Sequence, residues 1–274
     1  MDTRPASLPE SLYLSPRYLV TSTRADHADH LAAFAGTSGW TRTQDGATTD
    51  ITSPCGRITL RQDDDVPVRR PHLTITGRSG PGAPERWRVA VSGFMPVEFV
   101  SALTDTLANG LENDPDALVY GVGAGDEAIM ALDEEVWMPF NEGGLVGFHS
   151  QDYHAIVAGR PKGSPAPPME GDESVCWKVG AVVSTETAER LWTATFTYSI
   201  PSHLVAGLVN EVARFEPLLR PITSTLDLRV APLVRYWPVE TATPPRTPRS
   251  ADTRSTPPRP AAGEDPGRHA PRGR

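Results

Sequence analysis

The clearest pattern in the chain is a period-two alternation that passes directly into helical periodicity, and this pattern occurs twice. From Trp192 to Tyr198, aromatic and apolar residues alternate with threonines, which is typical of a half-buried strand. The stretch that starts at Trp87 alternates in the same way. After Pro96 and Pro201 the apolar residues recur at helical spacing, and proline suits the first turn of a helix. Each copy therefore predicts a strand followed by an amphipathic helix.

Matching residues upstream extend the repeat over most of the chain. Trp87 and Trp192, like Pro96 and Pro201, are 105 residues apart, and Trp40 and Trp137, like Ser53 and Ser150, are 97 apart. A repeat of this length indicates two homologous units, because solenoid units are shorter. We therefore predict one unit over residues 15–113 and a second over residues 115–217, with loop insertions that account for the changing offset.

The predicted fold class is α+β, with two pseudo-symmetric repeats that are each an antiparallel meander sheet followed by a C-terminal helix. Strands are predicted near 40–44, 47–52, 57–62, 72–77 and 86–92, and again near 137–141, 145–149, 154–158, 175–183 and 191–199. Residues 1–14 are expected to be a loose lead-in, and 218–238 an extension that packs on the body. Residues 239–274 are rich in proline and arginine, cannot bury a core, and are expected to be disordered.

Charge is distributed unevenly along the chain. The whole chain carries −8, and residues 243–274 hold seven arginines and three acidic residues, a net charge of +4, so the remainder carries −12. Such an acidic body does not by itself indicate nucleic-acid binding. Lysine occurs only at Lys162 and Lys178, which together with abundant Ala, Gly and Pro is typical of a GC-rich genome.

The composition also limits the location and the cofactors. Cys55 and Cys176 have no motif partners, so neither a disulfide framework nor a zinc cluster is predicted. The sequence has no apolar run near the roughly 20 residues that span a bilayer, and its N-terminus has no signal-peptide core. We expect a cytoplasmic protein without a cofactor, a metal or a membrane partner.

Strand alternation in the first repeat predicts a polar sheet face. If the helix covers the apolar side, the opposite side carries arginines and threonines: Arg57, Thr59, Arg61, Thr74, Thr76, Arg86 and Arg88. Such a face is a candidate binding surface for single-stranded nucleic acid, and a solvated sheet face is the alternative.

Three other stretches contain residue types that can form a chemical site. His27 and His30 lie one helical turn apart, a spacing that can share a metal, but no third ligand is visible and Asp and His residues near a helix start are ordinary capping residues, which is the favoured explanation. His149, Asp152 and His154 suggest a hydrolase, although members of a catalytic triad are seldom adjacent in sequence. The glycines from Gly121 to Gly125 resemble a dinucleotide loop only superficially, because an acid follows them.

Several short motifs resemble the actinobacterial SPDY domain family, a domain of unknown function. They are Ser15-Pro-Arg-Tyr18, Gly39-Trp40-Thr41, Thr52-Ser53-Pro54 followed by Gly56-Arg57, the strand and helix from Trp87 to Pro96, and Ser150-Gln151-Asp152-Tyr153, with Gln151 in place of proline. The resemblance spans residues 15–217 as a tandem pair and implies no catalytic residues. The second copy departs at Val136-Trp137-Met138, where the first has Gly39-Trp40-Thr41.

These patterns lead to a functional hypothesis. A sheet followed by a helix, given twice, is similar to Whirly-type and PUR-type binders of single-stranded nucleic acid, although fold alone does not imply function. We expect a non-enzymatic module that binds single-stranded nucleic acid through its arginine and threonine face. The alternative is a protein-interaction or assembly module, and a hydrolase is the third hypothesis. The sequence does not determine the oligomeric state.

Overall fold

Ten strands form one antiparallel sheet in the computed structural model, which describes residues 11–121, 132–161, 163–164, 167–169, 174–184, 186–187, 189–221 and 229–239. The strands of the first half are β2 (Thr41–Asp45), β3 (Thr48–Thr52), β4 (Ile58–Asp63), β5 (Pro71–Arg78) and β6 (Glu85–Gly93). Those of the second half are β7 (Trp137–Glu142), β8 (Leu145–Ser150), β9 (Ala155–Gly159), β10 (Val175–Ser184) and β11 (Glu189–Thr197). The ten predicted strands are thus confirmed, with shifts of one or two residues at their ends. The predicted tail lies outside the described residues beyond Val239.

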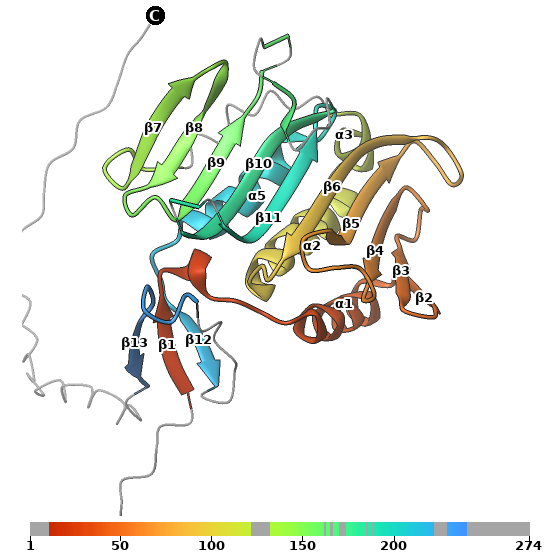
Figure 1. The fold of residues 1–274 in the computed structure, drawn as a ribbon. Coiled ribbons are helices and arrows are strands. Elements are labelled where there is room, and N and C mark those ends of the chain that lie inside the picture. Colours follow the sequence, from red (N-terminus) through yellow and green to blue (C-terminus); the bar gives the residue numbers. More distant parts are fainter. Residues whose placement is uncertain are drawn as a thin grey trace, which may run out of the picture. The chain divides into compact units, whose positions relative to one another are not determined.

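The two halves meet at the centre of the sheet. The strand order is β2-β3-β4-β5-β6-β11-β10-β9-β8-β7, so each half is a five-stranded meander and the last strand of each pairs with the other. In this central antiparallel pair, Trp192 lies opposite Gly93 and Phe196 opposite Val89. The two predicted repeats therefore share a single sheet, which Figure 1 displays from one side.

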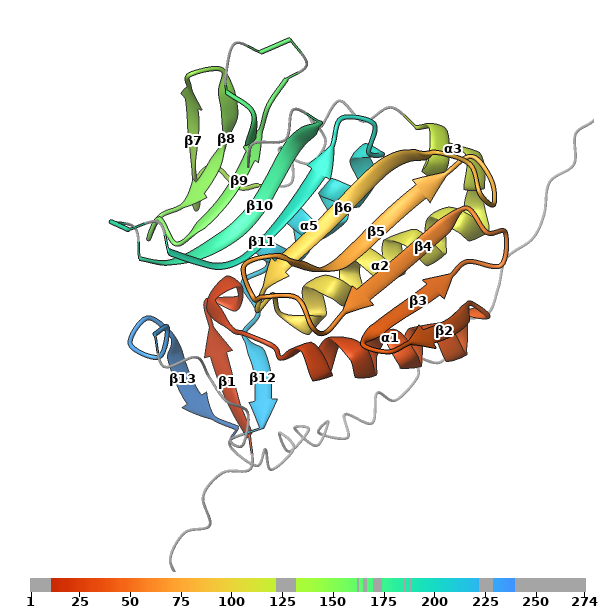
Figure 2. The same cartoon turned by 45° about the vertical axis from the view of Figure 1, so that its right-hand side comes forward.

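Helices cover one face of this sheet. They are α1 (Arg24–Ser38), α2 (Val97–Asn113), α3 (Pro115–Tyr120) and α5 (Ser202–Ala213). The long helix of each half, α2 and α5, lies behind the strands of that half, and the two helices pack against each other (Figure 2). Each follows its strand as predicted, but Pro96 and Pro201 are N-cap residues with extended ψ angles of 137° and 131° rather than first-turn residues. The helices consequently begin one residue later.

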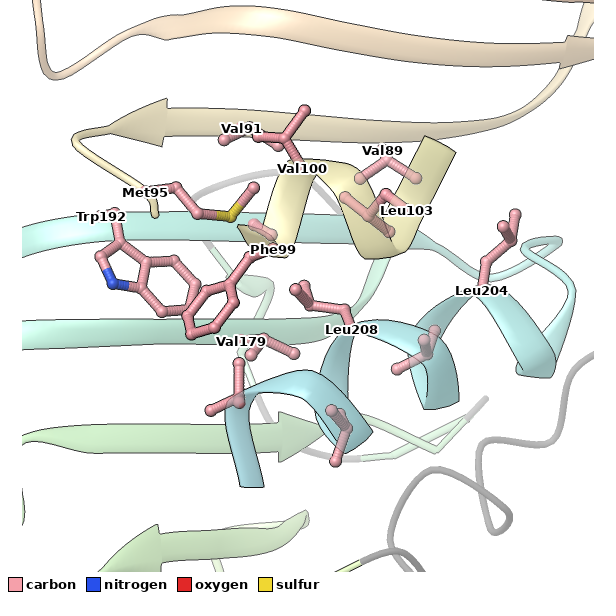
Figure 3. Close-up of a cluster of buried hydrophobic side chains, with 14 of the residues drawn as sticks. Val89, Val91, Met95, Phe99, Val100, Leu103, Val179, Trp192, Leu204 and Leu208 are labelled. Atoms are coloured by element: carbon pink, nitrogen blue, oxygen red, sulfur yellow. The ribbon is translucent and has the colours of Figure 1, made fainter. Parts of the chain in front are cut away.

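The core lies between the helices and the sheet. Trp87 and Trp192 are almost completely buried, as predicted, with exposed fractions of 0% and 1%. Their indole N–H groups donate to backbone carbonyls, Trp87 to Leu118 at 3.1 Å and Trp192 to Tyr18 at 2.8 Å. Phe99 of α2 meets the edge of Trp192 of β11, with ring centroids 5.4 Å apart (Figure 3). The core is therefore continuous across the two halves.

A small three-stranded sheet completes the described part of the chain. Here β1 (Ser11–Ser15) pairs with β12 (Leu218–Pro221) on one side and β13 (Arg235–Pro238) on the other, and the single-turn helix η1 (Arg17–Leu19) follows β1. Residues 11–14 were predicted to be part of a loose lead-in, and this is corrected. Leu14 packs into the core, and β1 pairs through its backbone with both β12 and β13.

Candidate functional site

The face of the sheet opposite the helices is the face that the sequence predicts to be polar. Strand register places Thr59 next to Thr76 and Thr76 next to Arg88, and it places Arg61 next to Thr74. These five side chains alternate with the buried row of Leu60, Ile75 and Val89, so they share the uncovered side. We call this side the open face.

The open face is hollowed where the two halves meet. A cavity of about 310 Å³ lies over β6, β11 and the loop before β5. It is lined by Arg69, Pro71, Arg88, Ala90, Ser92, Val175, Arg190, Thr193, Thr195 and Thr197. Three arginines and four hydroxyl side chains therefore converge on one concave surface, which we call the central hollow.

Hydroxyl groups of β11 hold the floor of the central hollow in place. The backbone N–H of Arg88 donates to Thr197 Oγ1 at 2.9 Å, and the Thr195 hydroxyl donates to the carbonyl of Ala90 at 3.4 Å. The pleat points both threonines to the same side as Arg88. Threonine's stiff χ1 keeps these hydroxyls in fixed positions.

The arginines of the open face are exposed and differ in their ion pairs. Arg88 lies 2.9 Å from Glu85, and Arg61 makes a two-pronged contact with Asp50 at 2.7 and 2.8 Å. The Arg61 guanidinium holds the pKa of Asp50 below its usual range. Arg69 is exposed and makes no ion pair with any residue in the described part of the chain. A single exposed pair such as that of Arg88 with Glu85 is weak, so an incoming anion can compete for this guanidinium group.

Two of the predicted site residues lie elsewhere, which corrects the expectation that all four arginines share the open face. Arg57 Nη1 contacts Asp116 Oδ1 at 2.6 Å, and Arg86 lies 4.7 Å from the ring centre of Tyr120. Asp116 and Tyr120 belong to α3, which packs on α2 in the helix layer. A register shift between β5 and β6 leaves Arg86 outside the regular alternation, and Arg57 precedes β4. The alternation from sequence could not reveal either irregularity.

The residues that the second half contributes to the central hollow were not predicted from the sequence. Thr193, Thr195 and Thr197 were recognised as one side of a strand, but nothing in the sequence indicated that β11 pairs with β6. Arg69 and Arg190 also line a larger adjoining cavity of about 700 Å³, in which Arg229 contacts Glu189 at 2.5 Å. Basic side chains thus extend beyond the central hollow, past the end of β6 and the start of β11.

The open face of the second half is more apolar. Ala158 lies opposite Lys178, and Lys178 opposite Thr195, so these residues share the open face. Met169 packs with Ala158 and Val175 there, with Phe140 and Ile156 against this cluster. This apolar cluster limits the polar part of the open face to its centre and its first half.

His27 and His30, which are one helical turn apart, form hydrogen bonds with different partners. His27 bonds through Nδ1 to His72 Nε2 at 3.0 Å and through Nε2 to the carbonyl of Met95 at 2.7 Å. His30 instead bonds through Nε2 to Thr104 Oγ1 at 3.0 Å. Among the described residues, no group of three His, Cys, Asp or Glu side chains is arranged to hold a metal ion.

His149, Asp152 and His154, the residues of the hydrolase hypothesis, are neighbours, but their side chains form hydrogen bonds with other groups and not with one another. The Asp152 carboxylate accepts from the Ser150 hydroxyl at 2.5 Å and from the Tyr18 hydroxyl at 2.8 Å. The His154 ring bonds to the carbonyl of Val182 at 3.0 Å, and the His149 ring lies 3.3 Å from the carbonyl of Ser150. Burial raises the pKa of Tyr18, so its hydroxyl stays protonated and donates to Asp152. These bonds tie the turn after β8 to η1.

The architecture is thus a mixed α+β protein whose strands pair antiparallel and whose open sheet face carries a basic, hydroxyl-lined hollow. Comparison with protein families shows that residues 149–218 match the model described as SPDY: Domain of unknown function (DUF317). No curated protein and no solved structure matches the chain. No helix in the described part of the chain is long and apolar enough to cross a membrane.

Proposed function

We propose that the protein is a non-enzymatic module that binds single-stranded nucleic acid on its open face, with the central hollow as the main contact. The observation that carries this proposal is the convergence of Arg69, Arg88 and Arg190 with Ser92 and three threonines on one concave surface. Arginine pairs with phosphate through two parallel N–H bonds, and serine and threonine hydroxyls are common phosphate donors. The hollow therefore offers both kinds of group that a nucleic-acid backbone requires.

The shape of the site favours a single strand over a duplex. A duplex is usually read by a helix or a two-stranded ribbon that enters its major groove. Among the described residues, the lining of the central hollow comes from the flat of a sheet and one loop, which present no such projecting element. A flexible single strand can follow a concave sheet surface.

The acidic body opposes this binding at long range. Residues outside the C-terminal segment carry −12 in total, which repels a polyanion. At physiological ionic strength the Debye length is about 8 Å, so arginines in contact with the strand outweigh acids at greater distance. We therefore expect weak binding that depends steeply on salt.

We also infer that the chain is a tandem pair of related units, and matching turns support this. Ser53 Oγ accepts from the N–H of Ile58 at 3.0 Å, and Ser150 Oγ accepts from the N–H of Ala155 at 2.9 Å, each five residues downstream. In both turns the third residue after the serine has a positive φ, 67° at Gly56 and 62° at Tyr153. The family match covers residues of the second unit. The likeness to Whirly-type and PUR-type binders remains an analogy of architecture.

Fluorescence anisotropy with a labelled single-stranded oligonucleotide tests the proposed function. We expect the wild type to bind at low salt, and the triple variant Arg69→Ala, Arg88→Ala, Arg190→Ala to lose most of this affinity. The double variant Arg57→Ala, Arg86→Ala is the matched control, because it also removes arginines but only from the contacts with α3. Absence of wild-type binding, or equal losses in both variants, would contradict the proposal.

A protein-interaction module is the second candidate, and one observation favours it. On one face of the small sheet of β1, β12 and β13, Leu219 and Trp237 flank Tyr13 and are 51% and 41% exposed. Exposed apolar side chains that cluster on a surface are typical of protein interfaces. Co-purification of a protein partner that survives nuclease treatment, together with no oligonucleotide binding, would favour this function over the first.

A further inference from the structure

Three aromatic rings from the second half stack on one another. Phe140 of β7 and His149 of β8 lie with their ring centroids 6.1 Å apart and their planes 12° from parallel. Tyr153, in the turn after β8, stacks on His149 at 4.3 Å and 27°. Tyr153 is 56% exposed, so the stack ends in a ring that is open to solvent.

The stack lies on the same face as the central hollow. Strand register places His149 opposite Ile156, Ile156 opposite Gly180, Gly180 opposite Thr193 and Thr193 opposite Ser92. Thr193 and Ser92 line the central hollow. Four strand spacings separate β8 from β6, which is about 19 Å. The rings and the hollow therefore lie along one line across the open face, which crosses β8, β9, β10, β11 and β6 (strand order in Figure 1).

The backbone of Tyr153 indicates that this ring is not required by its turn. Tyr153 has a φ of 62° and is the only non-glycine residue with positive φ in the described part of the chain. The matching turn of the first half holds Gly56 in the same conformation, with a φ of 67°. Left-handed backbone is unfavourable for a bulky side chain, and such strain gathers at functional positions. The turn could use glycine, so the tyrosine serves another purpose.

The first half has no equivalent stack. At the constant offset of 97 residues, Phe140, His149 and Tyr153 correspond to Thr43, Thr52 and Gly56. These positions carry no ring, although the strands and the turn are the same. The aromatic stack is therefore a feature of the second half alone and is not needed to build either meander.

We propose that Tyr153, supported by His149 and Phe140, is a stacking site for an unpaired base of the strand whose phosphates contact the central hollow. This inference rests on the proposed function and adds to it the site that contacts a base of the bound strand. Every base has a π-face, so stacking on an aromatic ring holds a single strand without reading its sequence. Asp152, the acid nearest in sequence, already accepts bonds from Ser150 and Tyr18. The ligand is thus a polymer with both phosphates and unpaired bases, rather than any polyanion.

The test compares two fluorescent probes, an oligothymidylate 15-mer and an abasic phosphodiester strand of the same length. We expect wild type to bind the thymidylate more tightly than the abasic strand. Tyr153→Gly should lower thymidylate affinity by about 5-fold to 150-fold, the range that one stacked base supplies, and leave abasic affinity unchanged. Glycine suits this backbone, so the variant should keep its fold, and Tyr153→Trp should restore the preference.

The controls separate this site from the proposed function. Tyr236→Ala removes an exposed ring from the small sheet and should leave both affinities unchanged. Since Tyr153 is uncharged, its variants should keep the wild-type salt dependence. Wild-type binding that is equal for both probes, or unaffected by Tyr153→Gly, overturns the stacking site and leaves the proposed function standing. No wild-type binding to either probe overturns both.

Discussion

Acidification should destabilise the protein through a buried pair of histidines. His27 of α1 and His72 of β5 have exposed fractions of 0% and 1%, and their rings stack 5.2 Å apart. A register shift in β5 lets His72 and Leu73, which are consecutive, both point inward. Because the carbonyl of Met95 can only accept, His27 donates from Nε2 and accepts from His72 at Nδ1. His72 Nδ1 then remains a buried acceptor without a hydrogen-bond partner.

The sign and size of the effect follow from the lowered pKa values of both rings. Burial, the neighbouring His27 and then Arg24 lower the pKa of His72 from 6.5 to about 3, and burial also lowers that of His27. Between pH 6.5 and about pH 3 the unfolded chain binds a proton at His72 that the folded chain does not bind. The free energy of unfolding is therefore highest above about pH 6.5 and falls as the pH drops. His72 alone should cost about 2 kcal/mol at pH 5. Unperturbed carboxyl groups have pKa values of about 4, which is below this window.

Urea unfolding followed by tryptophan fluorescence at pH 7.5 and pH 5 measures this cost. We expect the wild type to lose at least about 2 kcal/mol of unfolding free energy between the two conditions. His72→Gln keeps a donor for His27 but cannot titrate, so its loss should be smaller by about 2 kcal/mol, whatever its stability at pH 7.5. A wild-type change below about 0.5 kcal/mol, or an equal change in the variant, would refute the reasoning.

Two further predictions concern the core and the matching turns. Trp192→Ala should cost about 3–5 kcal/mol, because the ring is fully buried against Phe99, and an unchanged urea midpoint would show that it is not part of the core. Ser53→Ala and Ser150→Ala should each cost at least about 1 kcal/mol by removing the acceptor of a buried N–H, and Ser150→Ala should cost more because its hydroxyl also donates to Asp152; an unchanged urea midpoint for either variant would argue against this role.

Local patterns predicted the elements of this chain well. Alternation of large and small or polar side chains located β6 and β11, since period two is a property of one strand alone. Burial of Trp87 and Trp192 followed from the same alternation, because each stands on the apolar row of its strand. The dipeptide Asp45-Gly46 is typical of a tight turn, and Gly46 has a φ of 58° between β2 and β3.

The candidate site was predicted only in part, because it depends on long-range pairing. Arg61 and Arg88 follow the alternation and lie on the open face, while Arg57 and Arg86 turn to α3 at irregular positions. The central hollow requires β6 to pair with β11, a contact between residues about 100 positions apart. Tyr153 belongs to a motif that the sequence shows, but its positive φ and its stacking on His149 are visible only in three dimensions.

The salt dependence of oligonucleotide affinity tests the central claim most directly. For single strands, the logarithm of the binding constant falls with the logarithm of salt concentration by about 0.7 for each phosphate neutralised. If Arg69, Arg88 and Arg190 each contact one phosphate, removing all three should flatten this slope by about 2. A wild-type slope near zero, or the same slope in wild type and triple variant, would contradict binding through the central hollow.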